Sequence, residues 1–303
     1  MKKFFLFIML CAAGTGAETA VRISPQGASY IDVEILDSQN LMTFQTPSGD
    51  VWIAELDPMT GLFDSQSGKN FFVDSLAVHP SQTLNGPEFG VDKHDWAVVY
   101  TKAVDNVPQV WLADYSNNNF ENRAVTFGWV RRQTALASKN TNAASIQMVY
   151  AIGSLGGLMA WTDENIAGSE TVIDSVDRGI RWVDSSNQLV YVKQSGADKG
   201  ELAVYDTDTG EDIIITNDGR TKSNPYGWFA PELRGEMAVL ALLDGDTKIG
   251  VYKETGNEFW QLFRTIRVPD SSKYAYFGSP EPFTAAGKSF ISCVIKEKAN
   301  AYS

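Results

Sequence analysis

The sequence predicts an all-β protein, a five-bladed β-propeller closed by pairing of its N- and C-terminal strands. Short runs that alternate apolar and polar residues recur between turns rich in Gly, Asp and Asn, as in antiparallel sheets. An aromatic and a charged residue also recur at intervals of 43 to 51 residues, a period typical of propeller blades. Six blades are the alternative, because about 280 residues divided by a repeat of about 48 is close to six.

Residues 1–20 have the layout of a cleavable secretory signal. Lys2 and Lys3 precede an apolar run, 4–13, and small residues close the segment. The run is too short for a membrane-spanning helix, which needs roughly 20 apolar residues. We therefore expect a secreted or periplasmic protein without membrane insertion, in which residues 21–303 form a single propeller domain.

Composition narrows the possible partners and cross-links. With 37 acidic against 25 basic residues, the net charge of −12 disfavours binding to nucleic acid or to anionic membranes. Loss of the signal removes Cys11 and leaves Cys293, so no intramolecular disulfide is expected. Cys293 lies in an alternating run and is predicted to be a core residue.

Five hairpins are expected along the chain, each followed by one more strand. The hairpins pair residues 41–46 with 51–56, 96–102 with 109–115, 147–152 with 157–162, 188–194 with 201–206, and 237–243 with 248–253. The following strands are 70–78, 123–127, 170–174, 212–216 and 259–266. A last strand, 288–295, is predicted to pair with the N-terminal strands 30–36, 41–46 and 51–56, which would leave no open sheet edge.

The connector ahead of each hairpin holds an aromatic and a charged residue. These are Glu88 with Phe89, Trp129 with Arg131, Arg181 with Trp182, Trp228 with Glu232, and Glu281 with Phe283. A proline precedes each of the three glutamates. By contrast, Trp52, Trp111 and Trp161 occupy matching places in the hairpins, where core packing between blades is expected.

Two stretches carry a resemblance to known families. Pro87-Glu88-Phe89-Gly90, followed by the strands 96–101 and 109–114, looks like the repeat unit of TolB-type propellers. The stretch 50–61, Asp-Val-Trp-Ile-Ala-Glu-Leu-Asp-Pro-Met-Thr-Gly, is similar to a phrase common in five-bladed glycoside hydrolases of the arabinanase group. The resemblance covers most of the mature chain and implies a propeller. The hydrolases' pattern of two aspartates and a glutamate is not matched residue by residue, so no catalytic set is carried over.

Connectors on one face of a propeller converge on its axis, so a shared site is expected there. The predicted ring is Glu88, Arg131, Arg181, Glu232 and Glu281, with Trp129, Trp182, Trp228 and Phe89 beside them. Three carboxylates in a partly dry funnel would raise at least one pKa and supply an acid and a base. The arginines would hold a substrate carboxylate or sulfate, and the aromatic faces would stack on sugar rings. The structural alternative is that these charges only pair with one another between blades.

Both histidines lie near Glu88. In a lyase acting on uronic acids, His94 would serve as a base and His79 would contact substrate. Two histidines and one glutamate fall short of a zinc spacing, so neither a metal nor another cofactor is expected. Residues 206–212 resemble half of a calcium loop, without the glutamate at its twelfth position.

These observations favour an exported, carbohydrate-active propeller. It would bind an oligo- or polysaccharide, with an acidic one fitting the arginines, and cleave it as a hydrolase or lyase with Glu88, Glu232 or Glu281 as acid and base. A non-catalytic propeller that binds glycan or protein, as in the TolB kind, is the first alternative. A cyclase or isomerase acting on a small hydrophobic molecule is the second.

Overall fold

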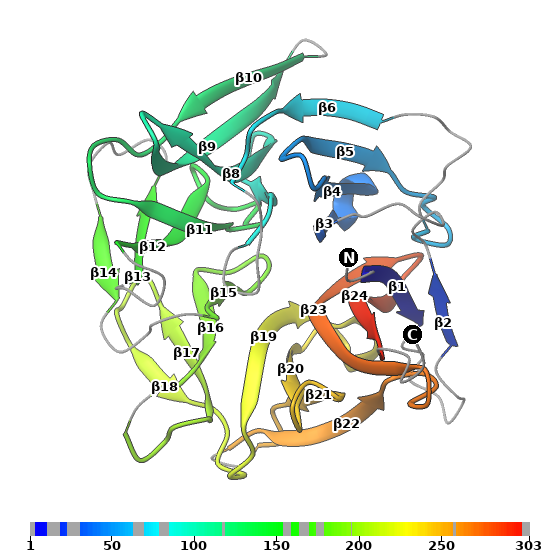
Figure 1. Cartoon of the computed structure of the whole chain (residues 1–303). Helices are drawn as coiled ribbons and strands as arrows, with labels where there is room; N and C mark the ends of the chain where they lie inside the picture. The colour runs from blue at the N-terminus through cyan, green and yellow to red at the C-terminus, as the bar shows by residue number, and fades with distance from the viewer. Residues whose placement is uncertain are drawn as a thin grey trace.

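The structure, a computed structural model, confirms the all-β propeller. It describes residues 4–10, 19–22, 31–62, 70–78, 85–116, 119–153, 159–163, 170–173, 179–194, 196–256 and 259–298. Within these ranges the only helical segments are two single 3₁₀ turns, η1 (Asp37–Gln39) and η2 (Pro231–Leu233). Small antiparallel sheets stand around a common axis (Figure 1). Among the described residues, none belongs to a helix long and apolar enough to cross a membrane.

Five blades are each built from four strands that follow one another in the chain. Blade 1 contains β3 (Ile31–Leu36), β4 (Leu41–Gln45), β5 (Val51–Glu55) and β6 (Asn70–Asp74). Blade 2 contains β7 (Glu88–Val91), β8 (Trp96–Val104), β9 (Val107–Ser116) and β10 (Asn119–Ala124). Blade 3 contains β11 (Arg132–Ala137), β12 (Gln147–Ile152), β13 (Met159–Asp163) and β14 (Thr171–Ile173). Blade 4 contains β15 (Arg181–Trp182), β16 (Gln188–Val192), β17 (Leu202–Asp206) and β18 (Asp212–Ile214). Blade 5 contains β19 (Lys222–Phe229), β20 (Met237–Leu243), β21 (Lys248–Lys253) and β22 (Gln261–Arg267). The five predicted hairpins are the two middle strands of these blades.

The ring is closed by a sheet made from both ends of the chain, as predicted. Its strands are β23 (Tyr274–Ala285) and β24 (Lys288–Glu297) with β1 (Phe4–Leu10) and β2 (Thr19–Arg22), in the order β2-β1-β24-β23. The predicted partners of β24 need correction, because the strands in 30–56 form blade 1 and β24 pairs with β1 instead. The predicted five consecutive blades are thus completed to a ring by this further four-stranded sheet.

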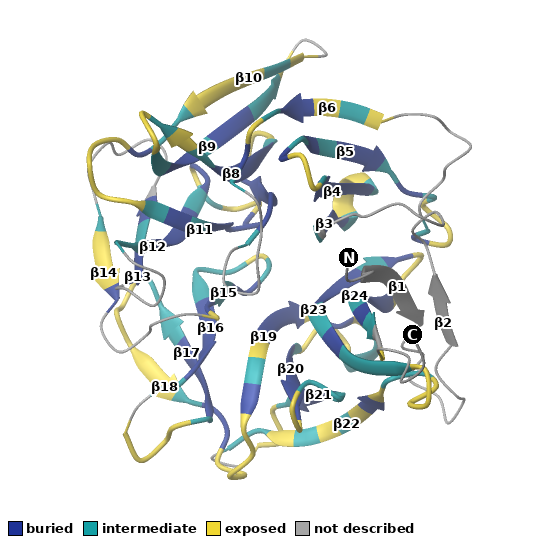
Figure 2. Cartoon of the chain, in the orientation of Figure 1, coloured by how far each residue is buried: buried dark blue, intermediate teal, exposed yellow. Residues whose placement is uncertain are grey.

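The hydrophobic core lies between neighbouring sheets (Figure 2). Each of its six buried clusters takes residues from two adjacent sheets, and together the clusters run around the whole ring. Cys293 is fully buried in the cluster between blade 5 and the closing sheet, as predicted. Trp52, Trp111 and Trp161 are partly buried against these clusters, which confirms their packing role.

Four of the inner strands carry a β-bulge that contains a residue with positive φ. Pairing slips between Ile31 and Glu34, Gln133 and Leu136, Ser223 and Tyr226, and Gly278 and Glu281. The left-handed residues are Asp32, Thr134, Asn224 and Ser279, with φ of 50°, 57°, 45° and 41°. A bulge redirects the side chain that follows it. In three of the four strands that side chain is polar and points to the propeller axis.

Candidate functional site

Six side chains, one from the inner strand of each sheet or from the turn just after it, meet at the propeller axis. They are Glu34 (β3), Glu88 (β7), Lys139 (after β11), Arg181 (β15), Tyr226 (β19) and Glu281 (β23). We call them the axial cluster. Five of them are buried, and the Arg181 side chain is only 13% exposed. The cluster therefore fills the axis with charge in a nearly dry environment.

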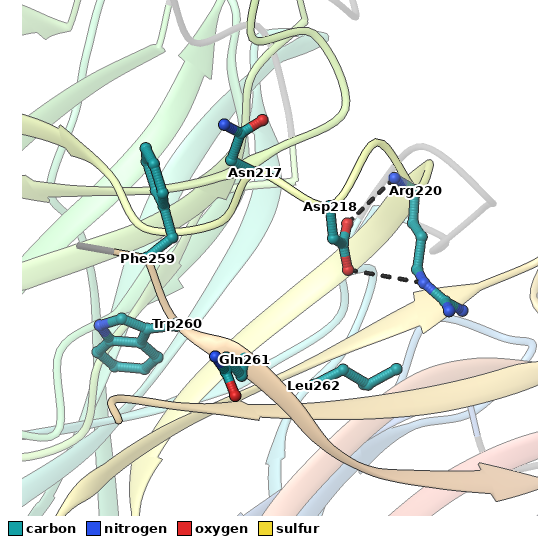
Figure 3. A pocket seen from close by; sticks show the side chains of 7 residues that line it. All are labelled: Asn217, Asp218, Arg220, Phe259, Trp260, Gln261 and Leu262. Atoms are coloured by element: carbon teal, nitrogen blue, oxygen red, sulfur yellow. Dashed lines mark hydrogen bonds and ion pairs between the residues drawn. The ribbon is translucent and has the colours of Figure 1, made fainter. Parts of the chain in front are cut away.

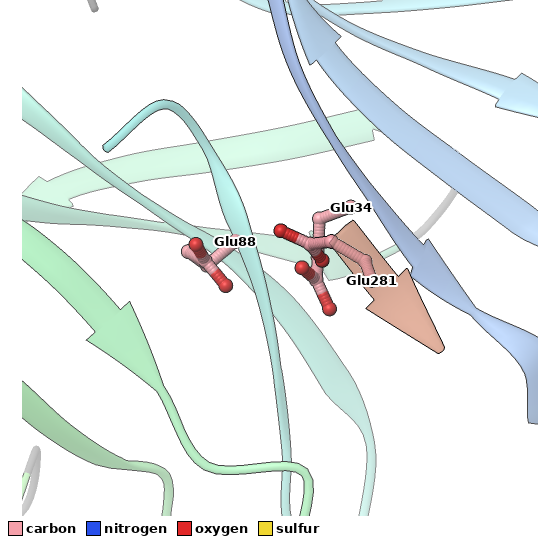
Figure 4. A group of neighbouring side chains, drawn as sticks. All are labelled: Glu34, Glu88 and Glu281. Carbon is pink, nitrogen blue, oxygen red and sulfur yellow. The ribbon is translucent and has the colours of Figure 1, made fainter. Parts of the chain in front are cut away.

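The three carboxylates of the cluster face one another (Figure 4). One oxygen from each of Glu34, Glu88 and Glu281 lies within 4.8 Å of the others. Arg181 bridges two of them, with Nη1 at 3.6 Å from Glu88 Oε1 and Nη2 at 3.9 Å from Glu281 Oε1. A single guanidinium thus offsets the charge of two buried carboxylates.

Lys139 pairs with the third carboxylate, that of Glu34. Its ammonium forms an ion pair with Glu34 and donates hydrogen bonds to Ile35 O and to the Tyr226 hydroxyl, each at 2.9 Å. The Tyr226 hydroxyl in turn donates to Glu34 Oε1 at 3.0 Å. Lys139, Glu34 and Tyr226 therefore form one connected network across the axis.

Burial and like charge separate the pKa values of the carboxyl groups. Burial, reinforced by the negative charge of Glu34, raises the pKa of Glu88 and that of Glu281 well above the usual 4.5. Burial acts on Glu34 in the same sense, but the charge and hydrogen bonds of Lys139 prevail and lower its pKa. Glu34 is therefore the ionised partner of Lys139. The raised pKa values of Glu88 and Glu281 favour the neutral, protonated form of these two carboxyl groups.

A small cavity of about 150 Å³ opens over this cluster at the end where the inner strands finish. We call it the axial pocket. The lining residues that matter here are Asp37, Lys139, Asp184, Trp228, Phe229 and Phe283. Burial raises the pKa of Asp184 to about 7, although the charge of Lys139 works against this. Asp37 is held in place by a hydrogen bond from the backbone N–H of Thr284 to its Oδ2 at 3.1 Å.

Several of the predicted site residues do come together. Glu88, Arg181 and Glu281 belong to the axial cluster, and Trp228 lines the axial pocket. Phe89 is fully buried between blades 1 and 2, and Trp182 is 3% exposed between blades 3 and 4. These two aromatic residues are core residues and offer no face to a ligand.

The structure does not bring the other predicted ring members to the axis. Trp129 is 87% exposed in the loop before β11, and Arg131 ends that loop, at the opposite end of β11 from Lys139. Gln109 holds the loop by donating to the carbonyls of Gly128 and Val130, both at 3.0 Å.

Glu232 lies in η2, where its two oxygens accept hydrogen bonds from the backbone N–H and the hydroxyl of Ser289, both at 2.6 Å. It fastens blade 5 to the closing sheet and does not belong to the axial cluster.

His94 does not belong to the axial cluster. His94 is exposed in the turn between β7 and β8, where its backbone N–H donates to Asp92 Oδ1. His79 lies outside the described residues. In the stretch likened to a calcium loop, Asp206 Oδ1 accepts the N–H groups of Asp208 and Thr209 and so closes the β17–β18 turn.

The oxygens of the axial cluster are of a kind that hard cations prefer. Lys139 and Arg181 already supply two positive charges there, so we predict that no divalent cation is needed. A cation present at 100 times its Kd would add about 2.7 kcal/mol, which is a rise in Tm of several degrees for a domain of this size. We expect calcium, manganese or EDTA to move Tm by less than about 1 °C in a melting scan. A saturable rise that Glu281→Gln removes would contradict this.

Comparisons with known proteins bear on the fold alone. No family model and no curated protein matches the sequence. The structure is similar to that of a putative TolB from Agrobacterium tumefaciens, with a TM-score of 0.64 and 9% identity over 99% of both chains. It is also similar to TolB from Acinetobacter baumannii, with a TM-score of 0.51 and 10% identity over 97% of this chain and 64% of that one. The resemblance to TolB-type propellers is thereby supported, and neither neighbour is a glycoside hydrolase.

Proposed function

We propose that this protein is a non-catalytic binding propeller that recognises a protein partner through its axial pocket. The observation that carries the proposal is the state of the three axial glutamates, which are buried and bonded to Arg181 and Lys139. Acid and base carboxyls of a glycosidase flank a substrate roughly 5–10 Å apart. Here one oxygen of each carboxylate lies within 4.8 Å of the others. The side chains of Arg181 and Lys139 lie beside them.

The size of the axial pocket favours an anchor over a substrate. Sites for small molecules usually enclose about 300–1,000 Å³. The axial pocket encloses about 150 Å³, which suits a single side chain or a chain terminus inserted from a partner. A short extended segment of a protein, rather than a bound oligosaccharide, fits this opening.

The charges around the pocket favour a cationic anchor such as a lysine side chain or an amino terminus. Lys139 forms its ion pair with Glu34 and also acts on Asp184, so this one ammonium faces Glu34, Asp37 and Asp184, and the lining has an excess of carboxyls. Phe229, which is 41% exposed, offers aromatic surface to the apolar stem and to the cation itself, and the buried Trp228 and Phe283 form the pocket wall beside it. Asp184 gains its negative charge as the pH rises through about 7, so binding should strengthen over that range.

The test is selection of peptides from a displayed random library on the purified protein. We expect enrichment of peptides with a lysine or a free amino terminus, tighter binding at about pH 8 than at about pH 6, and at least tenfold weaker binding to Asp184→Asn. Asp198→Asn, at an exposed position in the β16–β17 connection, is the matched control. Selected peptides that bind Asp184→Asn and Asp37→Asn as well as wild type would refute the axial site. New reducing ends or unsaturated uronates from a polysaccharide panel would refute the non-catalytic assignment.

We further propose that the protein is exported, on the strength of Lys2, Lys3 and the apolar run 4–13. Removal of residues 1–20 would take away β1, which pairs with β24 at seven positions, and would leave an edge of β24 open. Intact mass measurement on protein released from the periplasm checks this. A mass that still includes residues 1–20 would show that β1 is a permanent strand of the closing sheet.

A further inference from the structure

We infer that a second site, in a groove between blades 4 and 5, binds a neutral sugar. The groove encloses about 430 Å³ and lies between the connection from β18 to β19 and the start of β22 (Figure 3). One wall is formed by Asn217, Asp218 and Arg220, and the other by Phe259, Trp260 and Gln261. We call this the inter-blade groove. Its volume lies within the range of about 300–1,000 Å³ usual for small-molecule sites.

The aromatic wall is fixed in place. Phe259 and Trp260 are both half-buried, and the indole packs against the core cluster between blades 4 and 5. The backbone N–H of Trp260 donates to Ile215 O at 2.7 Å, which ties the start of β22 to blade 4. Rigid aromatic surface in a groove is what the apolar C–H face of a sugar ring packs against.

The polar wall is held from beneath by a buried network. Asp218 Oδ1 accepts Lys222 Nζ at 2.6 Å and the N–H of Arg220 at 3.0 Å, and Asp218 Oδ2 accepts the Tyr252 hydroxyl at 2.9 Å. The Lys222 side chain is completely buried and also pairs with Glu201 at 2.7 Å. Asp218 is thereby locked in one position, and a ligand would meet an oriented carboxylate instead of a mobile one.

The remaining polar groups match hydroxyls. Arg220 is 46% exposed, and its Nε lies 3.7 Å from Asp218 Oδ2. Asn217 and Gln261 are exposed amides at the same opening, each with a donor and an acceptor. Sugar hydroxyls also both donate and accept, so donors and acceptors alternating across a groove suit them. Because Arg220 is paired with Asp218, the groove has no net charge to attract an acidic sugar.

The inter-blade groove shares no lining residue with the axial pocket. The inference is therefore independent of the proposed protein partner, and each site can be disabled without the other. A propeller with both sites would hold a protein at the axis and a glycan at its side.

The test is saturation-transfer NMR and calorimetry on the full chain with glucose, galactose, mannose, N-acetylglucosamine, cellobiose, maltose and galacturonate. We expect millimolar binding of at least one neutral sugar and none of galacturonate. Arg220→Ala, Gln261→Ala and Phe259→Leu should each weaken binding by about fivefold or more. Arg267→Ala, an exposed arginine at the far end of β22, is the matched control for Arg220→Ala and should leave affinity unchanged.

Three results would overturn the inference. They are the absence of binding by every neutral sugar at millimolar concentration, a preference for galacturonate, and sugar binding that Arg220→Ala and Gln261→Ala leave intact. Sugar binding lost in Asp184→Asn would move the sugar to the axial pocket and would also refute this site. Melting scans of each variant exclude unfolding as the cause of a loss.

Discussion

Replacing Arg181 by methionine is expected to destabilise the protein by about 3–5 kcal/mol at neutral pH, because two carboxyls then remain buried without a charged partner. Arg181 is the cation nearest both Glu88 and Glu281, at 3.6 and 3.9 Å. Methionine keeps most of the length and the apolar stem of the arginine, so loss of packing is small. Urea unfolding followed by tryptophan fluorescence measures the change in free energy.

The loss should depend on pH in a defined direction. The pKa values of Glu88 and Glu281 are raised in the folded protein, and the positive charge of Arg181 opposes that rise. A carboxyl whose folded pKa lies above its unfolded value stabilises the fold only while it is protonated, so stability falls as pH increases between the two values. The Arg181→Met variant should therefore lose less at about pH 5 than at about pH 8.

Arg267→Met provides the control, because that arginine is exposed on β22 and the axial carboxyls lie elsewhere. It should unfold like the wild type at both pH values. An equal loss for Arg181→Met at both pH values would show that ionisation of the axial carboxyls is not its cause. A loss below about 1 kcal/mol would show that other groups already compensate these carboxyls.

The strands of the five consecutive blades were predictable because their hairpins are short apolar runs rich in β-branched and aromatic residues, joined by turns that contain glycine, aspartate or asparagine. The closing sheet was harder to predict. β23 contains Glu281 and Phe283, which the repeat places in a connector, and its bulge at Ser279 interrupts the alternation. β1 lies inside an apolar run that also has the layout of a signal, and local pattern cannot separate the two.

Part of the axial site was predictable from two marks: the spacing of the charged connector residues, which includes Arg181, and a proline ahead of the inner-strand glutamates. Pro87-Glu88 and Pro280-Glu281 each begin or continue such a strand, and Pro225-Tyr226 follows the same pattern with a tyrosine in place of the glutamate. Pro231-Glu232 has the same two residues but starts a 3₁₀ turn, since proline is equally suited to the first position of a helix.

Two further members left no such mark in the sequence. Glu34 follows a bulge at Asp32 that turns its side chain toward the axis, and simple alternation does not predict this. Lys139 lies beyond the end of β11 and reaches the axis through its long side chain. Both depend on tertiary geometry, and so does Asp184, which becomes part of a pocket only when the blades close into a ring.

The second large effect is expected at Lys139. Lys139→Met removes the counter-charge of Glu34 and the donor to Ile35 O, so we expect a loss of about 3–5 kcal/mol by urea unfolding. Glu34→Gln alone should also destabilise, because it leaves the ammonium buried without its anion.

The double variant decides whether the pair is one unit. With both charges gone, neither residue leaves the other uncompensated, so the double loss should fall short of the sum of the single losses by about 1–3 kcal/mol. Glu34→Gln combined with Arg181→Met is the matched control, because Arg181 pairs with the other two glutamates. The loss of unfolding free energy in this double variant should lie closer to the sum of the two single losses. Strict additivity for Lys139 and Glu34 would mean that Asp184 and Tyr226 hold Lys139 instead. Asp184 would then be neutralised, and the axial pocket would have no excess negative charge with which to select a cation.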